Sequence, residues 1–318
     1  MASAQRNGKR AAERQAEDAM ITLTTPTMAQ LAEITETLGA WQTPEWVGFL
    51  HPGDLGWHST AGAERVAADL RCWSDAGRVL AIGMFDGDDL LRLAMAPTAL
   101  GDDDLARGIA ADLAGDRLLP PGAATLEARG AHALRDHLRA AGWEPGDAWT
   151  ALQLDLEAPI PEARAGVDLR IAEVGPDEAE AWAAVHWSAF RGTVPSAEEL
   201  RKHVDRWTGI AAGPFGRLAR HLIGYDRADA PVAATTVWSA GVGRTGLIEP
   251  LGVHSDHRGR GYGREMTLAG ARALRRLGAA TAGVAAEQAN PGALNTYLAA
   301  GFRAGAPVAD LTRAAAGA

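Results

Sequence analysis

The chain has 318 residues, of which 47% are apolar and 22% are charged, the proportions of an ordinary soluble globular protein. Its formal net charge of −9 argues against a nucleic-acid binder, which needs a basic face to displace counterions. A single cysteine, Cys72, excludes an intrachain disulfide framework and a multi-cysteine metal site, and we interpret it as a small buried apolar residue. No apolar run reaches the roughly 18 residues that a bilayer requires, so we expect no membrane partner.

The first half of the chain begins with "MASAQRNGKRAAERQAEDAM", which is charged throughout and lacks the apolar segment of a secretory signal. It predicts a disordered leader over 1–20 and a cytoplasmic protein. The next segment, "ITLTTPTMAQLAEITETL", predicts a strand and then a helix entered through Thr25-Pro26-Thr27. Further on, "HALRDHLRAAGWEPGDAWTALQLDL" predicts an amphipathic helix, a stop at Gly142 and a β-like run.

The second half repeats this order after "LEAPIPEARAG", a proline-containing extended linker. "DLRIAEVGPDEAEAWAAVHWSAF" predicts a strand and a helix, and "GALNTYLAAGFRAGAPVADLTRA" predicts a helix, a stop at Gly301 and a β-like run. We therefore predict an internal duplication of α/β units with mixed sheets: one domain over 21–156, a linker over 157–167 and a second domain over 168–318.

The strongest functional pattern is "IEPLGVHSDHRGRGYGREMTLAG", residues 248–270. It predicts a strand, a glycine-rich turn and a helix N-terminus, where free N–H groups and arginines favour a phosphate. A turn with solvated arginines is the alternative. The alternating glycines do not match the dinucleotide or nucleoside-triphosphate fingerprints. Because proline interrupts strand pairing, Pro250 predicts a gap in which a linear ligand pairs with the backbone of Leu251 to Val253.

Two motifs in this half resemble those of a known superfamily. "VHSDHRGRGYG" is similar to the R-G-x-G-x-G acyl-CoA signature of the GNAT N-acyltransferases, although Ser255 replaces the usual proline. "NPGALNTYLAAGF" fits their N-x-x-A-x-x-x-Y-x-x-x-G-F pattern. The resemblance implies acetyl-CoA as the co-substrate and a tandem layout similar to that of the mycothiol synthases. It implies that coenzyme A is bound by Leu251, Gly252, Val253, Arg258, Gly259, Arg260, Gly261, Tyr262, Gly263, Arg264 and Asn290.

Transfer to an amine needs a base for the amine proton and an acid near the departing sulfur. We expect Glu249, on the strand before the gap, to be the base and Tyr297 to be the acid. His186 and His254 are weaker candidates for the base. The structural alternatives are a surface carboxylate for Glu249, a core aromatic for Tyr297 and a helix cap for Asn290. The resemblance places the acceptor pocket near His186, Trp187, Phe190 and Arg191.

The first half carries none of these groups at the aligned positions. "TALGDDDLARG" replaces the glycine turn, and its three aspartates would repel a pyrophosphate. Leu91 aligns with Glu249, Leu138 with Tyr297 and Ala131 with Asn290, so we predict a degenerate GNAT-like domain.

The sequence thus predicts an enzyme that transfers an acetyl group from acetyl-CoA to an amine of a small molecule, without a bound metal. The alternatives are a non-catalytic acyl-CoA sensor or scaffold, and an enzyme that uses a longer acyl donor. The sequence selects neither the acceptor nor an oligomeric state.

Overall fold

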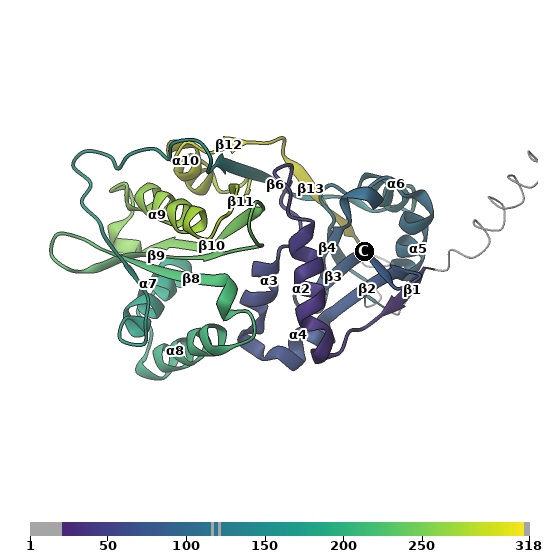
Figure 1. Ribbon diagram of the computed structural model, residues 1–318, viewed down its shortest axis with the longest axis horizontal. Helices are drawn as coiled ribbons and strands as arrows, with labels where there is room; N and C mark the ends of the chain where they lie inside the picture. Colours follow the sequence, from purple (N-terminus) through teal and green to yellow (C-terminus); the bar gives the residue numbers. More distant parts are fainter. Residues whose placement is uncertain (1–20, 116–117, 120–121, 315–318) are drawn as a thin grey trace, which may run out of the picture.

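The structure is a computed structural model that describes residues 21–115, 118–119 and 122–314. The leader predicted over 1–20 lies outside these residues. One mixed sheet runs through both halves of the described chain, in the strand order β1-β2-β3-β4-β5-β13-β6-β11-β10-β9-β8-β7, with β12 paired to β6 off this path. Figure 1 shows two lobes that meet where β6 and β13 lie side by side.

The first lobe is built from segments that the sequence predicted as strand, helix, helix and strand, with further elements between them. Its strands are β1 (Thr22–Thr24), β2 (Leu70–Asp75), β3 (Arg78–Phe85), β4 (Leu90–Met95), β5 (Ala124–Glu127) and β6 (Glu144–Asp155). Its helices are α2 (Leu31–Ala40), α3 (Pro52–His58), α4 (Ala63–Asp69), α5 (Asp103–Ala114) and α6 (His132–Ala140), with short 3-10 turns η1 (Met28–Gln30), η2 (Ser59–Ala61) and η3 (Pro97–Ala99).

The second lobe has the same plan. Its strands are β7 (Arg170–Glu173), β8 (Ala219–Tyr225), β9 (Pro231–Trp238), β10 (Thr245–Val253), β11 (Thr281–Glu287), β12 (Arg303–Ala304) and β13 (Val308–Arg313). Its helices are α7 (Ala179–Arg191), α8 (Ala197–Ala212), α9 (Tyr262–Arg276) and α10 (Pro291–Ala299), with 3-10 turns η4 (Gly216–Leu218) and η5 (Ser255–His257).

Strand pairing confirms the predicted duplication. β1 to β4 pair antiparallel and β4 pairs parallel with β5, while β7 to β10 pair antiparallel and β10 pairs parallel with β11. In each half a helix follows the fourth strand and another follows the fifth. The predicted helix stops are also present, because Gly142 and Gly301 take φ of 90° and 89°, a conformation that glycine adopts without strain.

The two halves exchange their last strands. β13 lies between β5 and β6, and β6 pairs with β11 over Trp149 to Asp155. Each of the predicted domains, 21–156 and 168–318, therefore ends in a strand that completes the sheet of the other half. The core is shared as well, because the main apolar cluster of the first half includes Trp238, Leu247 and Leu311.

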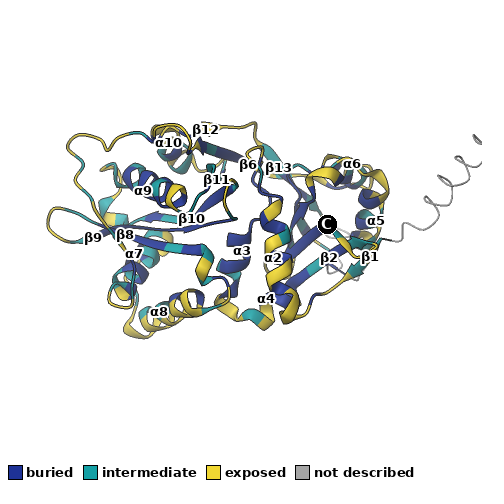
Figure 2. Ribbon diagram, viewed as in Figure 1, coloured by how far each residue is buried: buried dark blue, intermediate teal, exposed yellow. Residues whose placement is uncertain are grey.

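Burial follows the layers of the fold. In Figure 2 the strands are mostly buried and the helices expose one face. Cys72, on β2, is 3% exposed, as predicted, and burial raises its pKa to about 11, which keeps the thiol protonated. Within the described ranges, the helices are too short or too polar to cross a membrane.

The segment between the halves has no regular secondary structure, as its prolines predicted. It crosses helix α9, where the Arg272 and Arg264 side chains donate hydrogen bonds to the carbonyls of Pro161 (2.8 Å) and Glu162 (3.1 Å). The linker thus fixes the position of the helix that follows the glycine turn.

Candidate active site

Strand β10 separates from its parallel neighbour next to Pro250. β10 pairs with β11 from Thr245 to Leu247, and the register with β9 shifts between Ile248 and Leu251. This irregularity is the predicted interruption. Beyond it, the backbone of Leu251 to Val253 runs along a cavity instead of along β11, so the gap predicted beside the strand is confirmed.

The glycine turn leads into helix α9 as predicted. Gly261 is the N-cap residue with φ of 89°, a conformation that side chains disfavour. At Gly263 a Cβ atom would lie 3.1 Å from the Thr296 side chain, so helix α10 packs closely on the first turn of α9. The residues of that turn line a cavity, and the free N–H groups of a helix N-terminus favour an anion.

The cavity has a volume of about 670 Å³ and is bounded by β10, the glycine turn, α7 and α10. Ten of the eleven residues predicted to hold coenzyme A line it: Leu251, Gly252, Val253, Arg258, Gly259, Gly261, Tyr262, Gly263, Arg264 and Asn290. Tyr297, the predicted acid, lines it too. The two sequence motifs therefore lie around one cavity, and their contacts with a ligand stay a prediction.

The three arginines of the turn differ in their contacts. Arg258 lines the cavity and donates a hydrogen bond to the carbonyl of Ala189 (2.6 Å). Arg260 turns back onto its own loop, 3.2 Å from the carbonyl of Asp256. Arg264 forms an ion pair with Glu265 and donates to the carbonyl of Ala299 (2.8 Å). Arg258 is thus the best placed of the three to meet an anion.

Helix α7 packs directly over β10. A Cβ atom at Gly252 would lie 2.5 Å from the Cβ of Ala189, so the close approach of the helix requires glycine there. Ser255, which replaces the family's usual proline, is bound through its N–H to the hydroxyl of Ser188 on α7 (3.1 Å). The substitution therefore joins the turn to this helix.

Asn290 and Tyr297 both have structural roles. The Asn290 side chain caps α10 by accepting a hydrogen bond from the N–H of Ala293 (3.1 Å), as the helix-cap alternative held. Tyr297 is 7% exposed, and burial, followed by the charge of Glu249, raises its pKa above the usual value. Its hydroxyl keeps its proton at neutral pH, as a general acid must.

Glu249 lies two residues before the lined part of β10. Its carbonyl accepts a hydrogen bond from the Trp238 indole (2.7 Å). Although Glu249 keeps some exposed surface, burial raises the pKa of its carboxyl to about 7, with Asp54 adding to the rise and Arg92 opposing it. A carboxylate with this pKa can accept a proton near neutral pH.

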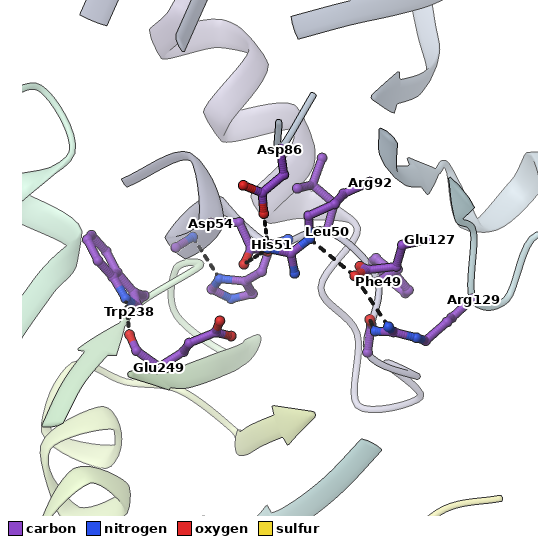
Figure 3. A network of polar contacts seen from close by, with 12 residues as sticks. Phe49, Leu50, His51, Asp54, Asp86, Arg92, Glu127, Arg129, Trp238 and Glu249 are labelled. Atoms are coloured by element: carbon purple, nitrogen blue, oxygen red, sulfur yellow. Dashed lines mark hydrogen bonds and ion pairs between the residues drawn. The ribbon is translucent and has the colours of Figure 1, made fainter. Parts of the chain in front are cut away.

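The first half contributes charged groups that the sequence did not reveal. Figure 3 shows Arg92 among the carboxylates of Asp54, Asp86 and Glu127. These groups lie at the seam, the boundary between the two halves, and the Glu249 carboxyl points toward them from the second half. No short motif marked them, because they come from α3, β4, β5 and a loop, and only the folded sheet brings them to Glu249. Because these four residues are far apart in the sequence, their clustering could not be predicted from it.

The two histidine candidates have other partners. His186 stacks on Trp182 and shares a 2.8 Å hydrogen bond with His203; burial lowers its pKa to about 3, which makes it a weak base. His254 accepts a hydrogen bond from the N–H of Asp256 and caps η5. Of the predicted acceptor residues, Phe190 lines the cavity, while Arg191 lies over the Trp187 ring.

The corresponding turn of the first half is acidic. Asp102 caps α5, and Asp103 and Asp104 form ion pairs with Arg107. Strand β4 pairs with β3 in continuous register from Leu91 to Met95, in contrast to β10. Ala131 is the N-cap of α6 and Leu138 is buried, at the places of Asn290 and Tyr297. Within the part of the chain that the structure describes, no group of three or more potential ligands could hold a metal ion.

Comparisons with known proteins agree with this geometry. Residues 179–302 match the acetyltransferase (GNAT) family. A mycothiol acetyltransferase of Thermobispora bispora is 32% identical over 149 residues, which are 45% of this chain and 49% of the relative. One of Nocardiopsis dassonvillei is 33% identical over 185 residues, 54% and 53% of the two chains. The chain thus spans about half the length of the curated relatives it matches.

Solved structures extend the likeness to nearly the whole chain. A tandem GNAT protein from the clavulanic acid biosynthesis pathway superposes with a TM-score of 0.58 at 18% identity, covering 94% of this chain and 100% of that one. A GCN5-related N-acetyltransferase from Sphaerobacter thermophilus gives 0.51 at 16% identity, covering 92% and 95%. These likenesses show the fold, and they confirm the predicted α/β tandem architecture.

Proposed function

We propose that the chain, whose residues 179–302 form a domain of the GNAT acetyltransferase family, transfers an acetyl group from acetyl-CoA to an amine of a small molecule. The observation that carries the proposal is the single cavity lined by the glycine turn, by the part of β10 that is not paired with β11, and by Tyr297, whose pKa is influenced by the charge of Glu249.

The charge and hydrogen-bonding groups of the cavity support coenzyme A as its ligand. Arg258 and the N–H groups at the start of α9 suit the pyrophosphate, since both favour an anion. The backbone of Leu251 to Val253 offers hydrogen bonds to the amides of the pantetheine arm, in the way that an extended peptide adds to a strand. Bound there, acetyl-CoA would supply the acetyl group as a thioester.

Glu249 and Tyr297 would carry the two proton transfers. The Glu249 carboxylate takes a proton from the acceptor ammonium, so that the neutral amine can attack the thioester carbon. The Tyr297 hydroxyl, held protonated by burial, gives its proton to the sulfur as the carbon–sulfur bond breaks. The nitrogen loses its second proton as the tetrahedral intermediate collapses to the amide, and this proton restores the Tyr297 hydroxyl, while Glu249 releases its own proton to water.

A thiol-release assay with acetyl-CoA and a panel of amines tests the proposal. The names of the curated relatives make amines related to mycothiol the first acceptors to include. We expect thiol release that depends on the acceptor and matches the acetylated amine mole for mole. Acetyl-CoA that binds but is never consumed with any amine would support the sensor alternative instead.

A further inference from the structure

The first half packs on β10, the strand that carries the proposed base, and on its neighbour β9. The His51 ring accepts the N–H of Gly53 through Nδ1 (2.9 Å), so its Nε2–H donates to the carbonyl of Thr245, at the start of β10 (3.1 Å). A Cβ atom at Gly53 or Gly56 would lie 2.5 Å or less from Trp238. Helix α3 therefore rests on the same tryptophan that holds the carbonyl of Glu249.

This anchoring brings an ion cluster to the seam between the halves. Asp54, in the first turn of α3, accepts a hydrogen bond from the N–H of His51 (2.6 Å) and pairs with Arg92 (2.9 Å). Arg92 also pairs with Glu127 (3.2 Å) and Asp86 (3.7 Å). The side chains of Asp54 and Glu127 are 3% and 8% exposed, so these charges are held in place and poorly screened.

The charged groups that face Glu249 come from several elements. They are Asp54 on α3, Arg92 on β4, Glu127 on β5 and Asp86 between β3 and β4, and the neutral Tyr297 hydroxyl on α10 also interacts with Glu249. In Figure 3 the Glu249 carboxyl points to the side of the seam where His51 and Arg92 lie. Arg92 is the one cation among the groups of the described chain that bias Glu249, and it is surrounded by carboxylates.

We propose that the N-terminal half is a working part of the active site, in which Arg92, held by Asp54, Asp86 and Glu127, is the positioning residue that favours the ionised form of Glu249 and so keeps it available as a base. The proposal rests on the base role given to Glu249 above. Without Arg92, Asp54 and Asp86 would lose their cation, Glu127 would keep only Arg129 (3.3 Å), and Glu249 would retain its proton at neutral pH. With Arg92 alone, Glu249 would be ionised but too weak a base.

The test is a titration of the Glu249 carboxyl carbon by NMR in carbon-13-labelled protein, with the resonance assigned from the Glu249→Gln variant. It needs no acceptor, so its result is independent of turnover. Removing Arg92 in Arg92→Gln should move the midpoint to higher pH by roughly half a unit or more, because a stabilising charge is lost. Asp86→Asn should move it to lower pH by a few tenths of a unit or more, because a repelling charge is lost.

Asp86→Asn is the second variant, because the Asp86 side chain is 47% exposed and we expect its replacement to leave the fold intact even where Arg92→Gln does not fold. Asp103→Asn is the matched control, since it removes the same charge from an exposed ion pair on α5 and should leave the midpoint in place. A Glu249 midpoint that moves to higher pH in Arg92→Gln and to lower pH in Asp86→Asn supports the proposal. A midpoint that stays at the wild-type value in folded Asp86→Asn would overturn it.

The outcome separates this proposal from the proposed function. If the Glu249 midpoint shifts as expected but the protein acetylates no amine, the electrostatic coupling is supported and the proposed acetyl transfer is overturned. Turnover with a Glu249 midpoint indifferent to Asp86 and Arg92 would overturn the coupling and leave the enzyme standing.

Discussion

At the residue scale, the three arginines of the glycine turn differ in the contacts that they already make within the protein. Arg258 and Arg264 both line the cavity, but Arg264 forms an ion pair with Glu265, and Arg260 is bound to its own loop. Three arginines that look equivalent in the sequence are therefore expected to contribute unequally to cofactor binding.

Arg258→Ala should weaken acetyl-CoA binding roughly ten- to a hundredfold, the range for losing one charge-assisted hydrogen bond. Arg260→Ala removes the same charge from the same turn and is the control; its effect should be severalfold smaller and should fade at high salt. Calorimetric titration measures both. Equal losses in the two variants would contradict the placement of the Arg260 side chain.

At the element scale, helices and their ends could be predicted from the sequence because their signals are local. The apolar spacing of α9, the glycine stops after α6 and α10, and the proline in β10 each act within a few residues. The contact of α3 with β9 could not be predicted, because Gly53 and Gly56 show no pattern that names Trp238 as the partner. The same holds for Arg92 and Glu249, which lie on strands of different halves.

The close contact of α3 with Trp238 predicts an unusual response to alanine. In Gly56→Ala the new methyl group would lie 2.2 Å from the Trp238 ring, so we expect a loss of about 1–3 kcal/mol in unfolding free energy from overpacking. Gly108→Ala in α5 is the control, because that site is open and alanine favours a helix; it should gain about 0.5–1 kcal/mol. Urea denaturation measures both, and a neutral Gly56→Ala would disprove the contact.

At the scale of the whole molecule, the two halves share one plan, differ in the turn that follows the fourth strand, and exchange their last strands. The repeated order of elements could be predicted from two similar segments of the sequence. The exchange of β6 and β13 could not, because the residues of a strand do not determine which other strand it pairs with. Because α5 begins with carboxylates and β4 keeps a continuous register, we expect no coenzyme A site in the first half.

Calorimetric titration of the intact chain with acetyl-CoA should therefore give one site per chain. Gly261→Val should abolish measurable binding, because valine disfavours φ of 89° and its side chain would crowd Val167. Two equivalent sites, or one site that survives Gly261→Val in a folded protein, would mean that the cofactor binds elsewhere.

The pH dependence of kcat/KM tests the central claim, acetyl transfer with Glu249 as the base, most directly. Because the base must be ionised and its pKa is raised to about 7, the wild-type rate should fall as pH drops through that value. Glu249→Gln should lower the rate roughly a hundred- to ten-thousandfold, the usual contribution of a positioned base, with less loss at high pH, where more of the amine is neutral. A Glu249→Gln variant with wild-type rates and an unchanged acid limb would contradict the claim.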